Sequence, residues 1–280
     1  MNIQDIVDSD VKLPPSPQIL PKLQKLLRDP NCGLQEIITL VKVDAALTAL
    51  IIRNSNAAYL AMRQPSSNLE EAIIRIGLNQ TYRVVSTSVA KQLLQDALPL
   101  YRIGKGELLK EAICHALFLT SVGERRFIMD PESAYTIGIL HGLGKVIINQ
   151  YFLKRNVEVY GAADGPVDYL MEQKLLGFDN AQIAAAMLKK WNFPKAIYEP
   201  IRYQYTPKLG APMDKAPTAL LAVAAYVVPQ IFERGLDTVP PVYIGDPILL
   251  TLAGITEEDF IEGVLAVREG IQEYEQLLAG

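Results

Sequence analysis

Hydrophobic residues recur three or four positions apart along most of the chain, whereas alternating runs typical of strands are hard to find. The first stripe covers residues 19–27, after a proline-rich stretch at residues 13–17, and it ends before Asp29-Pro30. Similar stripes predict the next helices, at residues 34–41, 44–51, 69–76 and 78–94. Gly77 separates the last two. The pattern therefore predicts an all-α fold, with a first helical lobe over residues 1–95.

The second half of the chain continues the helical pattern after a hinge at residues 101–106. A long amphipathic helix is predicted from about residue 107 to 126, and Asp130-Pro131-Glu132 is typical of a helix start. We expect that helix to continue through His141 to about Tyr151. Further helices are predicted at residues 167–176, 180–191, 194–204 and 211–235, and from residue 256 to the end. The expected architecture is a two-lobed multi-helix bundle, with a second lobe at residues 96–210 and a C-terminal helical extension at residues 211–280.

The last predicted helix carries apolar residues on one seam and is otherwise rich in acidic residues. Thr256 and Asp259 are placed to cap its N-terminus. The seam has two interpretations, which the sequence leaves open. It either packs back on the second lobe, as surface helices usually do, or pairs with a helix of a partner protein.

Composition narrows the classes of partner. The 280 residues carry a formal net charge of −4, which provides no general attraction for nucleic acid or for an anionic membrane. Residues 71–90 have a helix-turn-helix outline, which keeps DNA binding as a third hypothesis. Residues 218–228 are apolar but are interrupted by Pro229 and are too short to span a membrane. Without a signal-like N-terminus, and with only two cysteines, the chain is predicted to be cytoplasmic.

Only two histidines, His115 and His141, are available for imidazole chemistry. His141 lies in the sequence Gly138-Ile139-Leu140-His141-Gly142-Leu143-Gly144-Lys145, which resembles the His-Asp motif of the HD phosphohydrolases with glycine in place of aspartate. Other motifs in matching order are Leu13-Pro14-Pro15-Ser16-Pro17, Asp44-Ala45-Ala46-Leu47-Thr48, Asn54-Ser55-Asn56, Leu69-Glu70-Glu71-Ala72-Ile73, Arg75-Ile76-Gly77 and Trp191-Asn192-Phe193-Pro194. Together they resemble the HDOD domain over residues 11–210. The resemblance implies an all-helical fold, an HD-like second lobe and a role in bacterial signal transduction.

The resemblance also shows which ligands of a divalent cation are missing. Gly142 supplies no carboxylate, and Asn180 and Gln204 stand where the family commonly has histidines. With His115 and His141 alone, the chain offers too few donors for a metal. We therefore predict no metal, no cofactor and no catalytic residue. The residues expected to line a remnant cleft are His115, His141, Gly142, Lys145, Asn180 and Gln204.

Two functions follow from this pattern. The first is a non-catalytic signalling module that binds a partner protein or a small effector, with no nucleic acid or membrane partner and an oligomeric state left open. The alternative is a metal-dependent phosphohydrolase acting on a nucleotide or cyclic dinucleotide. Its ion would be held by His115, His141 and a carboxylate such as Asp164 or Asp168.

Overall fold

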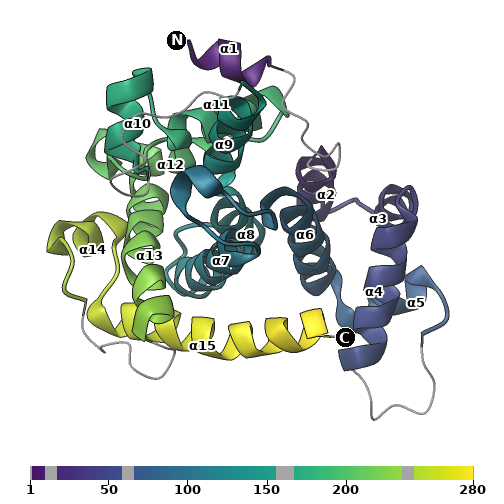
Figure 1. Cartoon of the computed structure of the whole chain (residues 1–280). Helices are drawn as coiled ribbons and strands as arrows, with labels where there is room; N and C mark the ends of the chain where they lie inside the picture. Colours follow the sequence, from purple (N-terminus) through teal and green to yellow (C-terminus); the bar gives the residue numbers. More distant parts are fainter. Residues whose placement is uncertain (1, 10–17, 59–65, 156–166, 235–242, 280) are drawn as a thin grey trace. The chain divides into compact units, whose positions relative to one another are not determined.

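The computed structural model describes residues 2–9, 18–58, 66–155, 167–234 and 243–279 (Figure 1). Within these residues the fold is all-α, which confirms the prediction, and the only β-type pairing among them is an isolated bridge between Leu98 and Ile103. The chain divides into two compact units. One is Pro14–Val89, and the other combines Met1–Leu13 with Ala90–Gly280. The N-terminal residues and the C-terminal helices therefore belong to the same unit, whereas the division predicted from the sequence has boundaries after residues 95 and 210.

The smaller unit is built of short amphipathic helices that pack on one another. It comprises α2 (Ile19–Arg28), α3 (Leu34–Lys42), α4 (Ala45–Ala58), α5 (Leu69–Ile76) and the start of α6 (Leu78–Leu94). Helix α3 contacts α2, α4 and α5, and its buried Val41 lies three and four positions after the buried Ile38 and Ile37. Between α5 and α6, Gly77 has φ +80°, a conformation that favours glycine.

The larger unit contains the remaining helices. They are α1 (Ile3–Val7), η2 (Pro99–Tyr101), α7 (Glu107–Arg125), α8 (Pro131–Leu140), α9 (Leu143–Arg155), α10 (Tyr169–Leu176), α11 (Asn180–Lys190), α12 (Lys195–Arg202), η3 (Pro207–Leu209), η4 (Pro212–Asp214), α13 (Lys215–Arg234), α14 (Pro247–Ala253) and α15 (Glu257–Ala279). The sequence pattern did not predict α1 or α14. None of the helices in the described segments has the length and apolar character needed to cross a membrane.

One predicted helix is two helices in the structure. The expected helix from residue 131 to about Tyr151 is interrupted at His141 and Gly142, which form a turn between α8 and α9. The prediction of a continuous helix was wrong because apolar residues follow the helical period on both sides of a break that glycine permits. The break matters for the site, since it places His141 at the C-terminal end of α8.

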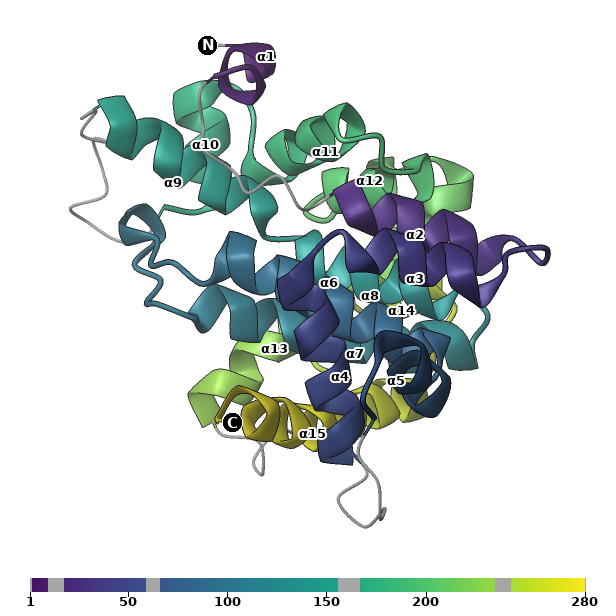
Figure 2. The same ribbon diagram turned by 90° about the vertical axis from the view of Figure 1, so that its right-hand side faces the viewer.

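Helix α7 is the centre of the larger unit, with contacts to α8, α13 and α15. In both Figures 1 and 2, α15 lies below α7, which it contacts. The contact is close at Gly263, where an added Cβ atom would lie 2.5 Å from the ring of Phe118. At the start of α15, Asp259 forms an ion pair with Arg126 (2.6 Å) and accepts a hydrogen bond from the Thr256 N–H (2.7 Å). The predicted cap is therefore present, and the described part of the seam packs back on its own unit.

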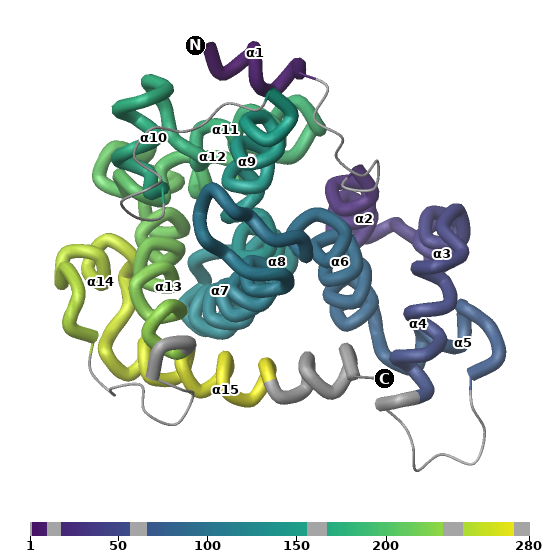
Figure 3. Tube along the Cα trace, viewed as in Figure 1, coloured from purple at the N-terminus to yellow at the C-terminus, as the bar shows by residue number. Residues whose placement is uncertain are grey.

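Helix α1 packs against α11 and α9 at the other end of this unit (Figure 3). Its Ile6 and Val7 are buried, and the Lys190 ammonium of α11 donates a hydrogen bond to the Val7 carbonyl oxygen (3.0 Å). The same ammonium pairs with Asp8 at 2.7 Å. A cation at the C-terminal end of a helix satisfies carbonyl groups that lack partners within the helix.

Candidate functional site

The two histidines are brought together by a close contact between α7 and α8. An added Cβ atom at Gly138 would lie 2.3 Å from the backbone nitrogen of Ala116, so the backbones of the two helices approach each other directly at this position. One residue before Ala116 on α7 is His115, and three residues after Gly138 is His141. Their rings stack with centroids 3.9 Å apart and planes inclined by 26°. Both side chains are buried. The structure thus brings together two of the residues that the sequence pattern singled out.

Hydrogen bonds fix the tautomer of each ring. The Nδ1 atom of His115 lies 2.9 Å from the Glu111 carbonyl oxygen, and Nδ1 of His141 lies 2.7 Å from the Gly138 carbonyl oxygen. Since a carbonyl oxygen only accepts, each Nδ1 carries the proton, and in the neutral ring Nε2 keeps a lone pair. Burial, together with the neighbouring His141, lowers the pKa of His115 to about 3. His115 is therefore neutral, and its buried Nε2 has no hydrogen-bond partner among the described residues.

Glu111 is the carboxylate nearest to this pair, and the sequence analysis did not identify it. Its Oε1 atom lies 3.6 Å from Nε2 of His141. Burial alone would raise the pKa of Glu111, but the His141 imidazole and the Lys145 ammonium outweigh it and hold that pKa below its usual range. The spacing of Glu111 and His115, four residues apart on one helix, is a signal that could have revealed it.

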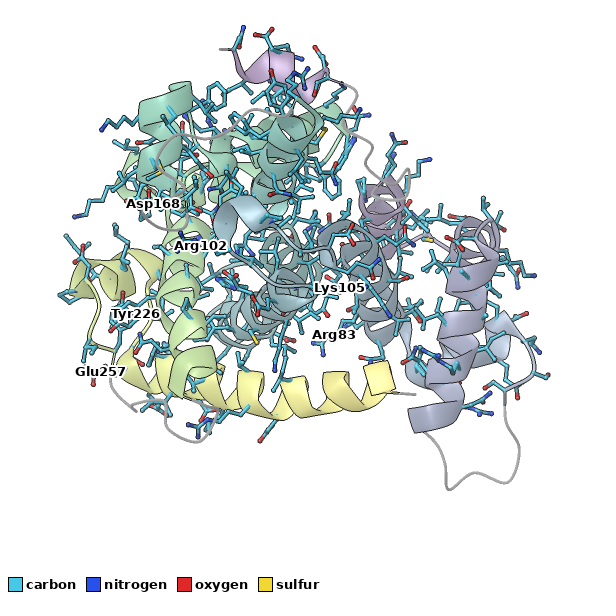
Figure 4. The ribbon with its side chains drawn as sticks, in the orientation of Figure 1. Arg83, Arg102, Lys105, Asp168, Tyr226 and Glu257 are labelled. Carbon is cyan, nitrogen blue, oxygen red and sulfur yellow. The ribbon has the colours of Figure 1, made fainter. Side chains whose placement is uncertain are left out.

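The sequence analysis considered two other carboxylates, Asp164 and Asp168, as possible ligands. Asp164 lies outside the described residues. Asp168 is at the N-terminus of α10, where its side chain accepts a hydrogen bond from the Met171 N–H at 2.8 Å (Figure 4). Asp168 is thus used as a helix cap.

A leucine fills the space next to Gly142. An added Cβ atom at Gly142 would lie 2.9 Å from Cδ1 of Leu108, which is itself buried, one turn before Glu111 on α7. Real Cβ atoms almost never come this close to another heavy atom. A carboxylate at position 142 therefore has no room unless Leu108 moves.

Gln204 contacts the backbone of His141, and Asn180 lies against Gly144, but the amide groups of both residues are engaged in internal hydrogen bonds. The Asn180 side chain donates to Oε2 of Glu172 (2.8 Å) and accepts from the Tyr205 hydroxyl (3.1 Å). The Gln204 side chain donates to the His141 carbonyl oxygen at 3.2 Å. Both residues are buried. These positions hold the helices around the pair in place.

The Asn180 amide belongs to a buried network around Glu172. The Tyr101 hydroxyl donates to one oxygen of this carboxyl at 2.5 Å, and the backbone N–H of Asn180 donates to the other at 2.6 Å. Burial raises the pKa of Glu172 even though these donors oppose the shift. The network ties together η2, α10 and α11, and through Tyr205 it reaches the segment after α12.

The donor types present could hold a divalent cation. Nitrogen or oxygen ligand atoms of Glu111, His115 and His141 all lie within 4.8 Å of one another. Donors on a tetrahedral zinc ion at about 2.1 Å would lie about 3.4 Å apart, so the distance of 3.6 Å between Glu111 and His141 suits it. The orientation of the two imidazole rings does not suit a zinc ion. An imidazole holds an ion in its own plane, and two nearly parallel stacked rings do not direct Nε2 at one point. Three-ligand binding would require the rings to separate.

Comparison with protein families gives a match to the HDOD domain over residues 13–207. A curated relative, an uncharacterised protein of Treponema pallidum, is 23% identical over 207 residues, or 73% of this chain and 39% of the relative. The chain therefore spans about two fifths of the length of that relative.

Solved structures share the fold. An HDOD domain protein of unknown function from Geobacter sulfurreducens is 20% identical, with a TM-score of 0.60 over 99% of this chain and 95% of that one. A candidate phosphohydrolase from Shewanella amazonensis is also 20% identical, with a TM-score of 0.64 over 95% of this chain and 97% of that one. A candidate signal transduction protein from Marinobacter aquaeolei gives 0.66 at 20% identity, over the whole of this chain and 62% of that one. At these identities the likeness shows the fold alone.

Proposed function

The chain belongs to the HDOD domain family, whose model matches well over half of it, and we propose that it is a non-catalytic regulatory module of bacterial signal transduction. In this proposal it acts by binding a partner protein or a small effector, and it does not hydrolyse a phosphate ester. A candidate signal transduction protein among its structural neighbours has the same fold, which is compatible with such a role.

The observation that carries the proposal is the way in which the missing ligand positions are used. A terminal methyl group of Leu108 lies against the position of a Cβ atom at Gly142, so a side chain there requires Leu108 to shift. The Asn180 amide is bonded to Glu172 and Tyr205, and the Gln204 amide is bonded to the backbone of His141. A catalytic metal needs several convergent protein donors and an open position for water. Here the corresponding positions contribute to packing and to internal hydrogen bonds.

A metal-dependent phosphohydrolase is the second candidate function, and one observation favours it. The buried Nε2 atom of His115 has no partner among the described residues, and burying a polar atom without a partner costs free energy. Glu111, His115 and His141 are the residues that would hold an ion, which would supply an activated water for attack on phosphorus. Glu111 is the carboxylate of this set among the described residues, whereas the sequence suggested Asp164 or Asp168.

Metal content and turnover separate the two functions. The untagged full-length chain, purified without chelator, would be analysed by elemental mass spectrometry and assayed with bis(p-nitrophenyl) phosphate. We expect far less than one equivalent of iron, manganese or zinc, and no turnover above that of heat-denatured protein. Near-stoichiometric metal that is lost in Glu111→Gln but kept in Glu124→Gln would establish the metal site and contradict the proposal. Glu124 is the matched control because it lies on the same helix and is exposed.

A restoration experiment tests the count of lost ligands. Gly142→Asp alone should bind no metal, because Leu108 crowds the new side chain at its Cβ atom and because Asn180 and Gln204 supply no imidazole. The double variant Leu108→Ala/Gly142→Asp makes room for the carboxylate and should still show no turnover. Strong metal binding or phosphodiester hydrolysis by either variant would mean that fewer ligands are missing than we infer.

A further inference from the structure

Residues of α1, α11 and α12 line a groove in the larger unit, and neither His115 nor His141 is among its lining residues. Figure 3 shows where these three helices lie. Its volume is about 640 Å³, within the range of roughly 300–1,000 Å³ typical of small-molecule sites. Apolar surface from Val7, Ala185 and Ala186 lines part of it. The groove is therefore large enough for a small organic molecule and offers it both apolar and polar contacts.

The charged side chains of the groove are mostly cationic. Lys189, Lys190 and Arg202 line it, and Glu199 is its one acidic lining residue. Lys190 is engaged by Asp8 and the end of α1, and Arg202 lies 3.7 Å from Glu199. No described residue forms a hydrogen bond or ion pair with the side chain of Lys189. With Asp8 and Glu199 counted against the three cations, one positive charge remains in excess, and on a chain with net charge −4 this favours an anionic ligand at this place.

Hydrogen-bond donors add to the charge. Asn192 and Tyr198 line the groove, and the side chain of neither is bonded to a described residue. Gln182 uses its carbonyl oxygen to accept from the Asp179 N–H (3.0 Å), which leaves its amide nitrogen as a donor. Asn192 has φ +61°, a left-handed conformation that asparagine tolerates better than most residues. The polar lining thus adds several neutral donors to the charged ones.

We propose that this groove binds a small organic phosphate. A phosphate group presents more acceptor oxygens than a carboxylate and a larger negative charge, which matches two cations and several neutral donors. Lys189 and Arg202 contact the phosphate, and the surface formed by Val7, Ala185 and Ala186 contacts the organic part. The site is independent of the proposed function, because it requires neither metal nor hydrolysis at the histidine pair.

Backbone NMR of the full-length chain would test this site, with AMP, glucose 6-phosphate, inorganic phosphate and succinate as separate probes. We expect saturable shifts of the amide signals of residues 189–192 with the phosphate-containing probes, and tighter binding of at least one organic phosphate than of inorganic phosphate. Lys189→Ala and Arg202→Ala should each weaken that binding by about tenfold or more. Lys174→Ala is the matched control, since Lys174 is an exposed lysine of the same unit outside the groove, and it should bind as the unaltered chain does.

Three results would overturn the proposal. One is that the amide signals of these residues do not shift when the phosphate probes are added up to roughly 10 mM. A dissociation constant above that concentration would be too weak for the site to bind a metabolite usefully. Another is binding that survives the double variant Lys189→Ala/Arg202→Ala with its thermal unfolding unchanged. The third is succinate binding as tightly as the organic phosphates, which would show that the groove selects carboxylates.

Discussion

Gly138 allows the helix contact that brings the histidines together, and replacing it gives a quantitative prediction. In Gly138→Ala the new methyl group would lie 2.3 Å from the Ala116 nitrogen and 2.4 Å from its Cα atom. Ordinary contacts begin near 3.4 Å, so α7 and α8 must separate by about 1 Å. Both nearby atoms are backbone and cannot rotate away, as the end of a side chain could.

The expected free energy follows from two opposing effects. Alanine is favoured over glycine in a helix by about 1 kcal/mol. Overpacking a close backbone contact costs up to about 3 kcal/mol, which leaves a net loss of about 2 kcal/mol. For a unit of this size, that loss lowers Tm by about 4–8 °C. The control is Gly123→Ala on α7, where the new methyl group would be 3.4 Å from its nearest neighbour.

Urea and thermal unfolding followed by far-UV circular dichroism would measure both variants. Gly123→Ala should be as stable as the unaltered chain or up to about 1 kcal/mol more stable, because it gains helix propensity without a clash. Gly138→Ala should be clearly less stable. The reasoning is refuted if the two variants unfold at the same urea concentration, or if Gly138→Ala is the more stable.

Three further predictions concern buried polar groups. Tyr101→Phe removes the hydroxyl that donates to Glu172 at 2.5 Å and should lower the free energy of unfolding in urea by about 1–3 kcal/mol. An unchanged free energy of unfolding would mean that the carboxyl finds another donor. Burial raises the pKa of Asp259, but Arg126 and Thr256 outweigh it and bring it to about 2, below the ordinary 3.8. The stabilisation that ionised Asp259 gives the fold is complete above pH 3.8 and is lost as pH falls towards 2. In Asp259→Asn, the free energy of unfolding should therefore change less with pH over that range. Burial lowers the pKa of His115 to about 3, so the free energy of unfolding should fall as pH falls from 6.5 towards 3. In His115→Phe, the free energy of unfolding should fall less over the same pH range.

Much of the fold follows from hydrophobic spacing and capping residues. The predicted first helix at residues 19–27 corresponds to α2, and Thr256 with Asp259 caps α15 as expected. Helix α1 escaped prediction because its five residues are too few to show a helical period, and its position depends on packing against α11. The break at Gly142 was missed because spacing alone does not distinguish one long helix from two short ones.

The candidate site could be predicted only in part. The resemblance to the HDOD domain identified His115 and His141, and the structure places their rings in contact. Glu111 was missed because an acidic residue one helical turn before a histidine forms no motif of its own, although this spacing places both on one face of α7. The role of Leu108 could not be read from the sequence, since a buried leucine on an amphipathic helix has no distinguishing pattern.

The matched family segment and the folded unit have different limits. The match ends at residue 207, yet α7 is also covered by α13 and α15, which come later in the chain. Cutting the gene at that point would expose the face of α7 that bears Phe118 and Val122, both now fully buried. Such an apolar face in water favours aggregation. An expression fragment designed on the family boundary would therefore lack part of its own core, and a soluble fragment must include α15.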